Sequence, residues 1–204
     1  AGTVSTFNLG SIFNMGGYIQ SIGQWTRDGG SGPDDYIVFV TNHGEAAIYT
    51  GSDPADATKW SLVGTFKLPR PIGKRCLINI NSDLVLICEQ GFMPLSQTLV
   101  TGENAPAKAI SDKISGSILD SVNNFASTFG WQGIIYPKGQ YGLFNVPTST
   151  VGDFDQYVVN VSTGAWGRFT GQNSFCWELL NGELYFGADT KVFKADNGDS
   201  NNTT

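Results

Sequence analysis

Short runs of apolar residues, alternating or continuous and separated by turn residues, make up most of this chain. The runs are rich in β-branched and aromatic residues, and their length suits strands better than helices. They predict strands at 36–40, 46–49, 60–68, 76–80, 83–88, 92–95, 132–136, 141–146, 157–161, 166–169, 174–180, 184–187 and 191–194. The strongest turn signal is Asn181-Gly182, because both central residues of the favoured hairpin turn need a positive φ. The pattern predicts an all-β protein.

One segment, 106–126, breaks the strand pattern. Apolar residues recur in it at intervals of four, four, four and three, namely Ile110, Ile114, Ile118, Val122 and Phe125. This spacing places them on one side of an α-helix. We therefore predict one inserted amphipathic helix, laid over the β scaffold.

Two segments near the N-terminus have a weaker pattern. The apolar spacing in Phe7–Trp25 fits a helical face, but its four glycines weaken a helix by roughly 1 kcal/mol each. A short helix and an inserted strand both remain open for this segment. The stretch Arg27–Asp35 is rich in Gly, Pro and Asp and is predicted to be a loop.

The hairpins recur at a regular distance. The glycines Gly44, Gly91, Gly139 and Gly182 are separated by 47, 48 and 43 residues, and each has an apolar strand before and after it. A period in the forties with several strands per unit is typical of β-propeller blades. We predict a β-propeller-like array of about four blades, in which the runs YIVFV and DLVLIC are innermost strands. A sandwich remains an alternative, and the ring could close within the chain or require flanking blades.

The five tryptophans are spread almost one per blade. They are Trp25, Trp60, Trp131, Trp166 and Trp177. This regularity favours packing between blades over a sugar-stacking platform, and Trp166 is predicted to be a wedge between two blades. The stretch Asn160–Asp196 is then the end of one blade joined to the start of the next. The domain prediction is a single propeller domain or propeller fragment over 1–204, with a polar tail at 197–204.

The composition limits the classes of partner. Glycine accounts for 26 of 204 residues and charged residues for only 15%, as expected for many tight turns. A net charge of −6 argues against a sequence-independent nucleic-acid surface, which needs clustered cations. Lys67, Arg70, Lys74 and Arg75 could form a local basic patch, which we interpret as solvated loop charge.

The cysteines and the apolar runs indicate no redox, zinc or membrane segment. Cys76, Cys88 and Cys176 show no CxxC spacing, and Cys88 and Cys176 lie inside apolar strands. They are predicted to be reduced thiols of the core. No secretory leader pattern is visible, and no apolar stretch approaches the 18 or so residues of a membrane span.

Candidate chemistry is sparse. His43 is the only histidine, and its place in Asn42-His43-Gly44 predicts a turn residue rather than a catalytic base. The loops carry seven carboxylates, Asp28, Asp34, Asp35, Asp53, Asp56, Asp153 and Asp155. The run 28–35 could fold around Ca²⁺ but lacks the EF-hand spacing, and a solvated turn is the preferred interpretation.

Glycoside hydrolysis would need two carboxylates roughly 5 to 10 Å apart. We predict no catalytic residue, no cofactor-binding residue, no metal ligand and no cofactor.

Two short segments resemble propeller motifs. The segment Ser52–Trp60 is faintly similar to the Asp-box of sialidase-like propellers, although its spacing differs and the central glycine is absent. The segment Asn160–Trp166, NVSTGAW, resembles the N/D-x-x-T-G-x-W turn of many propellers. In that turn Thr-Gly forms the bend and the Trp fills a gap between blades. Both motifs concern the fold and not an activity.

Over roughly residues 7–196 the chain resembles the β-propeller tail hub or nozzle proteins of short-tailed bacteriophages, also described as packaged-DNA-stabilising tail accessory factors. The segments that carry the resemblance are 34–54, 60–76, 109–114, 129–137 and 157–169. The resemblance implies a non-enzymatic virion protein, made in the host cytoplasm and assembled into the tail. It implies a ring of usually six copies beside other tail or portal-adaptor proteins, with passive contact to packaged DNA. The alternative is a glycan-binding or glycan-cleaving β-propeller.

Overall fold

The structure is a computed structural model, and it describes residues 6–28, 33–101 and 108–196. These residues form four antiparallel sheets, in agreement with the predicted all-β class. In every sheet the strands follow one another in chain order, so each strand pairs with its neighbours in the sequence. The four sheets are called sheet 1 to sheet 4 in chain order.

The first half of the chain supplies sheets 1 and 2. Sheet 1 contains β1 (Ile19–Asp28), β2 (Pro33–Thr41), β3 (Glu45–Gly51) and β4 (Trp60–Lys67). Sheet 2 contains β5 (Leu77–Ile80), β6 (Asp83–Cys88) and β7 (Gly91–Pro94). The helix α1 (Leu95–Thr101) follows β7 directly and contacts β6 and β7.

The second half supplies sheets 3 and 4. A short 3₁₀ turn, Asp112–Ile114, leads into α2 (Ser115–Phe125). Sheet 3 contains β8 (Gln132–Tyr136), β9 (Tyr141–Pro147), β10 (Phe154–Asn160) and β11 (Trp166–Phe169). Sheet 4 contains β12 (Cys176–Leu180), β13 (Glu183–Ala188) and β14 (Lys191–Lys194).

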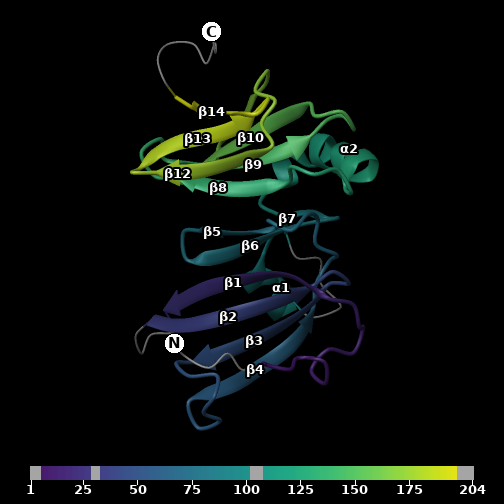
Figure 1. Cartoon of the computed structure of the whole chain (residues 1–204), viewed down its shortest axis with the longest axis vertical. Helices are drawn as coiled ribbons and strands as arrows, with labels where there is room; N and C mark the ends of the chain where they lie inside the picture. The colour runs from purple at the N-terminus through teal and green to yellow at the C-terminus, as the bar shows by residue number, and fades with distance from the viewer. Residues whose placement is uncertain (1–5, 29–32, 102–107, 197–204) are drawn as a thin grey trace.

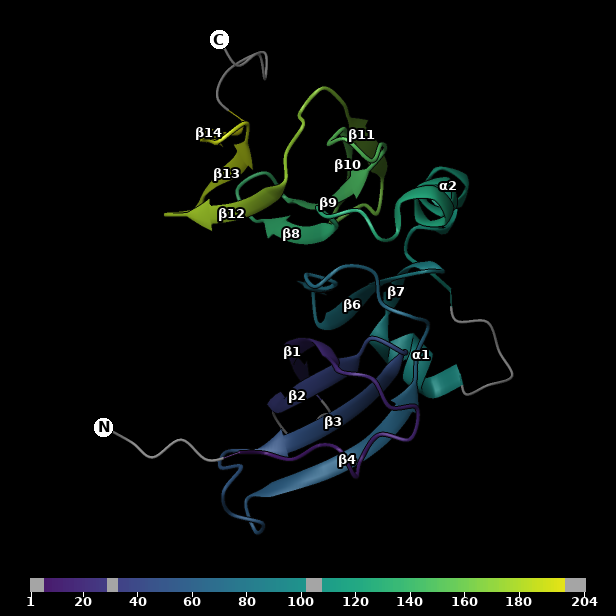
Figure 2. The ribbon, with the colours of Figure 1, turned by 45° about the vertical axis from the view of Figure 1, so that its right-hand side comes forward.

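The sheets are stacked in series along the long axis of the molecule. Sheet 1 lies at one end, sheet 2 in the middle, and sheets 3 and 4 at the other end (Figure 1). The first strands contact one another in order: β1 contacts β5, β5 contacts β8, and β8 contacts β12. Figure 2 shows the same order from a second side. Sheets 1 and 4 therefore face away from each other at opposite ends of an open array.

Small residues on the first strands allow the sheets to approach closely. A Cβ on Gly23 of β1 would lie 2.8 Å from Leu77 Cδ1, and one on Gly133 of β8 would lie 2.9 Å from Ile78 Cδ1. Both contacts are too short for a real Cβ. Side chains of β5 thus fill the space over both glycines, and one apolar core runs continuously through sheets 1, 2 and 3. A second, smaller core joins sheets 3 and 4.

The predicted helix is correct in its C-terminal part only. Helix α2 begins at Ser115, and Ile118 and Val122 are its buried apolar residues, in contact with the β7–β9 region. Lys108 to Ser111 is not helical, and 106–107 lie outside the described residues. Helix α1 was not predicted, because seven residues contain only one i, i+4 apolar pair, Leu95 and Leu99.

The chain forms four successive sheets, but the glycines do not mark equivalent hairpins. Gly44 and Gly91 lie between the second and third strands of sheets 1 and 2, whereas Gly139 and Gly182 lie between the first and second strands of sheets 3 and 4. The runs YIVFV and DLVLIC, predicted to be innermost strands, lie in β2 and β6, the second strands of sheets 1 and 2. The two runs differ in burial: DLVLIC is buried from Leu84 to Cys88, whereas in YIVFV only Val38 and Val40 are buried.

The N-terminal segment resolves into a strand and an irregular stretch. Residues 6–18 are irregular, and β1 covers the rest of the ambiguous segment. The predicted loop Arg27–Asp35 is shorter than expected, since β1 and β2 pair as far as Asp28 opposite Pro33. Residues 29–32 lie outside the described part.

The cysteine prediction is wrong for one of three residues. Cys76 and Cys88 are buried free thiols, but Cys176 is exposed. Cys176 begins β12, where its neighbour Trp177 takes the inward side of the strand and is buried. Since successive side chains in a strand point to opposite faces, the parity that buries Trp177 exposes Cys176.

This difference predicts a biphasic thiol reaction. Burial raises the pKa of Cys76 to about 11 and that of Cys88 to about 12, so both stay protonated and covered at pH 8. With Ellman's reagent at pH 8, we expect one thiol to react rapidly and two to react only on unfolding. A Cys176→Ser variant should lose the rapid phase. Two rapid phases in that variant would show that the core thiols are accessible.

Candidate functional site

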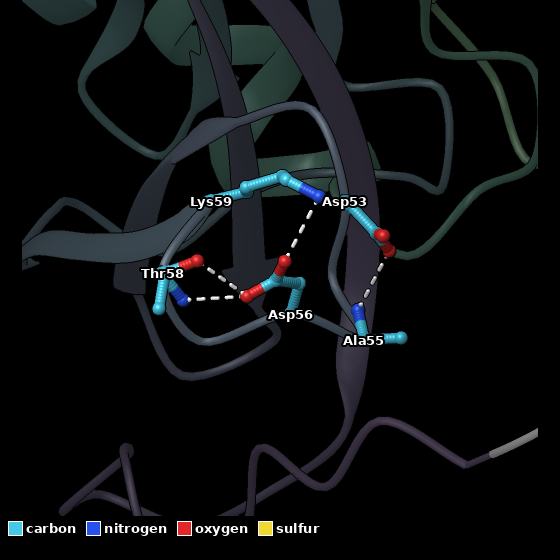
Figure 3. Close-up of polar contacts among 5 residues, drawn as sticks. All are labelled: Asp53, Ala55, Asp56, Thr58 and Lys59. Atoms are coloured by element: carbon cyan, nitrogen blue, oxygen red, sulfur yellow. Dashed lines mark hydrogen bonds and ion pairs between the residues drawn. The ribbon is translucent and has the colours of Figure 1, made fainter.

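The acidic turn between β3 and β4 is closed by its own carboxylates (Figure 3). Asp53 Oδ1 accepts the Ala55 N–H at 3.0 Å. Asp56 Oδ1 accepts the Thr58 N–H at 2.9 Å and the Thr58 hydroxyl at 2.6 Å, and Asp56 Oδ2 lies 2.9 Å from Lys59 Nζ. The hydrogen bond from the Thr58 side chain, followed by the one from Lys59, lowers the pKa of Asp56. These two carboxylates therefore stabilise a turn.

The second propeller-like motif lies at the corresponding place in sheet 3. It forms the turn between β10 and β11, and Asn160 Oδ1 accepts the N–H of Ser162 at 3.0 Å and of Thr163 at 2.8 Å. In both sheets the turn joins the third strand to the fourth, and the fourth strand begins with a tryptophan, Trp60 or Trp166. The two motifs are therefore equivalent by position, although in sequence they resemble two different propeller motifs.

His43 lies in the turn between β2 and β3, as predicted, and it contacts the N-terminal segment. Its Nδ1 is 2.9 Å from the carbonyl oxygen of Met15. Beside it, the buried carboxylate of Glu45 accepts the N–H groups of Asn14 at 3.0 Å and Met15 at 2.7 Å. Asn42 Oδ1 accepts the Tyr18 N–H at 2.8 Å. The stretch Asn42–Glu45 thus holds residues 14–18 against sheet 1.

The remaining loop carboxylates are dispersed. Asp35 accepts the Thr26 hydroxyl at 2.7 Å, Asp153 accepts Asn173 Nδ2 at 3.2 Å, and Asp155 lies 3.4 Å from Arg168 Nη1. The side chains of Asp28 and Asp34 are not among those described. Within the described residues, no group of three or more His, Cys, Asp or Glu side chains could hold a metal ion.

Three of the five tryptophans lie between sheets. Trp25 of β1 is buried and its Nε1 donates to the Ser82 carbonyl in sheet 2 at 3.2 Å. Trp177 of β12 is buried and its Nε1 donates to Asn145 Oδ1 in sheet 3 at 3.0 Å. The Trp166 ring lies 6.1 Å from Phe92 and 5.8 Å from Phe144, centroid to centroid. Because Phe92 belongs to sheet 2 and Phe144 to sheet 3, Trp166 contacts residues of both sheets.

The other two tryptophans have different surroundings. Trp131 is buried just before β8, and its Nε1 donates to the Phe125 carbonyl at the end of α2 at 2.9 Å. Trp60 lies on the end face of sheet 1, where it stacks on Tyr49 at 5.4 Å and meets Phe7 edge-on at 6.2 Å. Trp60 is therefore covered by the N-terminal segment and not by a neighbouring sheet.

A hollow of about 540 Å³ lies beside Trp166. Its walls come from the β5–β6 turn, the β10–β11 turn and the stretch 108–113, and they are mainly apolar, with Lys108, Lys113 and Asn160 among the polar members. Trp166 Nε1 donates to the Ile110 carbonyl at 3.2 Å, which fixes the orientation of the indole in this wall. The size is within the usual range for small-ligand sites.

A second hollow, of about 580 Å³, is lined by several charged side chains. We call it the basic groove. It lies between sheet 1, the connection from β4 to β5 and the connection from α2 to β8. Arg70, Lys74 and Arg75 line it, and Glu89 is the one carboxylate among its described lining residues. Lys67, the fourth member of the predicted basic patch, is not part of it.

The basic groove also contains aromatic side chains that the sequence did not single out. The Phe129 side chain is 68% exposed, and the Arg75 guanidinium carbon lies 5.1 Å from the centre of its ring. Tyr18, 60% exposed, comes from the other wall. A signal for Phe129 exists in FGWQGIIY, where an aromatic residue precedes a glycine outside the strand. No signal in the sequence connects it with Arg75.

A scan against protein-family models and a search of curated protein sequences find no match to this chain. The geometry above and the chemistry of the named residues are therefore the basis for the functional proposals. None of the helices among the described residues is long and apolar enough to span a membrane.

Proposed function

We propose that this chain is a non-enzymatic structural protein of a virion, a tail hub or nozzle ring subunit of a short-tailed bacteriophage. In this proposal the four sheets are consecutive blades of a β-propeller-like array. The protein would be made in the host cytoplasm and reside in the virion tail as a ring of six copies. Other tail or portal-adaptor proteins would be its neighbours, with passive contact to packaged DNA.

The observation that carries the proposal is the order of contacts among the first strands. In a propeller, each blade is an antiparallel meander whose first strand lies next to the central axis. Contacts of β1 with β5, β5 with β8 and β8 with β12 fit that arrangement. The equivalent turns that end in Trp60 and Trp166 support it, since both are third-to-fourth-strand turns.

The open ends of the array support a role in assembly. Sheet 4 presents β14 as an edge strand, and Val192 on it is 76% exposed. An exposed strand edge is a surface on which another chain can pair. A ring subunit needs such an end face, because each subunit must contact two neighbours.

Electron microscopy and light scattering of the purified protein test this function. We expect ring-shaped particles of several copies, and we expect Val192→Glu to reduce their formation by placing a carboxylate on the end face. Val151→Glu is the matched control, since Val151 is 86% exposed in the β9–β10 turn, away from that edge. A protein that stays monomeric at micromolar concentration would contradict the proposal.

A second candidate function is glycan binding or cleavage, favoured by the hollow beside Trp166. It combines an indole with polar groups such as Asn160, as saccharide sites do. Glycan-array binding that is lost in Trp166→Phe would favour this alternative, and so would hydrolysis of a glycan at micromolar protein. Rings without any glycan bound would favour the virion role.

A further inference from the structure

The basic groove has three cations and one carboxylate among its described lining residues. The chain carries a net charge of −6 with 12 Lys and Arg residues. Ion pairs join Lys59 to Asp56, Arg168 to Asp155, and both Lys138 and Lys194 to Glu183. Within the part of the chain that the structure describes, no carboxylate forms an ion pair with Arg70, Lys74 or Arg75. The groove is thus a local positive field on an acidic protein.

The backbone of the cationic loop and the Arg75 side chain are held in place. The Arg70 carbonyl accepts the Glu89 N–H at 3.0 Å, and the Ile72 N–H donates to the Ile87 carbonyl at 3.0 Å, so the cationic loop is tied to the end of β6. Arg75 Nη2 donates to the Phe175 carbonyl at 2.7 Å while its guanidinium lies over Phe129. Arg75, which is held in place before binding, loses little conformational entropy when a ligand arrives.

The aromatic residues of the groove indicate what kind of anion it fits. Arginine and aromatic side chains are the residues enriched at the centres of protein interfaces. Phe129 and Tyr18 together expose apolar surface next to three cations. A nucleic-acid strand is disfavoured, because its affinity depends mainly on cations that neutralise phosphates, and this groove offers three cations on a protein of net charge −6.

We propose that the basic groove binds an acidic segment of a partner protein. Carboxylates of that segment pair with Arg70 and Lys74, and an apolar side chain packs on Phe129. The hollow has a volume of only about 580 Å³, so the contact is a short peptide-like segment and not a large domain face. This inference does not depend on the virion role, because it rests on charge and shape in the isolated chain.

Selection from a random 12-residue peptide library on the purified protein tests the proposal. We expect enriched peptides to combine Asp or Glu with an aromatic or aliphatic residue. In fluorescence anisotropy, their dissociation constants should rise at least about tenfold in Arg70→Glu/Lys74→Glu. Both side chains are exposed and make no described contact that supports the fold. Added salt should also raise the dissociation constants of the selected peptides.

The control is Lys108→Glu/Lys113→Glu, which changes the net charge equally but lies on the hollow beside Trp166. It should leave peptide affinity within about twofold. Peptides without an acidic excess, or equal affinity for the groove variant and the control, would overturn the proposal. Tighter binding of a 20-residue oligothymidylate than of the selected peptides would overturn it in favour of nucleic acid. Ring assembly is measured separately, so failure of either proposal leaves the other standing.

Discussion

Replacing Asn145 with alanine is expected to lower the free energy of unfolding by about 4 kcal/mol. The Asn145 side chain is fully buried in β9. Its Nδ2 donates to the carbonyls of Gly130 and Ser174, both at 2.9 Å. Its Oδ1 accepts Gln156 Nε2 and Ser174 Oγ at 2.9 Å and Trp177 Nε1 at 3.0 Å. Alanine removes all five hydrogen bonds and leaves buried polar groups without partners.

Urea denaturation followed by circular dichroism measures this effect. Asn173→Ala is the matched control, because Asn173 is exposed and its two contacts, with Asp153 at 3.2 Å and the Phe154 N–H at 3.4 Å, are at the surface. We expect the control to cost less than about 1 kcal/mol. Equal losses in the two variants would mean that water replaces the Asn145 contacts and that the network does not join sheets 3 and 4.

The sequence predicted the strands well because their pattern is local. The bounds of β6, β8, β11 and β14 coincide with the predicted ones. At Asn181-Gly182 both residues have positive φ, 52° and 76°, as the two-residue hairpin turn requires. Alternation and turn chemistry are properties of adjacent residues, so a single sequence contains them.

Two of the errors concern relations between distant residues. Gly44 and Gly182 have the same local signal, but only tertiary contacts decide which hairpin of a sheet each belongs to. The exposure of Cys176 depends on which face of β12 meets sheet 3. In both cases the local pattern was right. Residues that are neighbours in the sequence do not specify where the hairpin or strand lies in the folded protein.

The candidate site was predictable only in part. The cations at 70–75 are close in sequence and were recognised as a patch, but Phe129 and Tyr18 reach them through the fold. Asn145 was passed over, although it is the single amide in the apolar strand YGLFNVP. A lone amide in a buried strand needs hydrogen-bond partners, so the sequence does contain a signal for this residue.

Trp166→Ala is expected to cost about 3 kcal/mol of unfolding free energy. The half-buried indole packs against Phe92 and Phe144, whose rings stack at 4.0 Å across sheets 2 and 3. Its removal leaves a space beside this pair and frees the Ile110 carbonyl that accepts Trp166 Nε1. Because both sheets border the space, neither can close it without moving the other.

The control for this prediction is Phe169→Ala in the same strand. Phe169 is 37% exposed and meets the Tyr141 ring edge-on at 6.1 Å, within sheet 3. We expect its loss to cost about 1 kcal/mol, since it does not lie between sheets. Thermal and urea unfolding followed by circular dichroism compare the two. A cost below about 1 kcal/mol for Trp166→Ala would mean that the indole is a surface group and not a wedge. Its principal role would then be to line the hollow beside it.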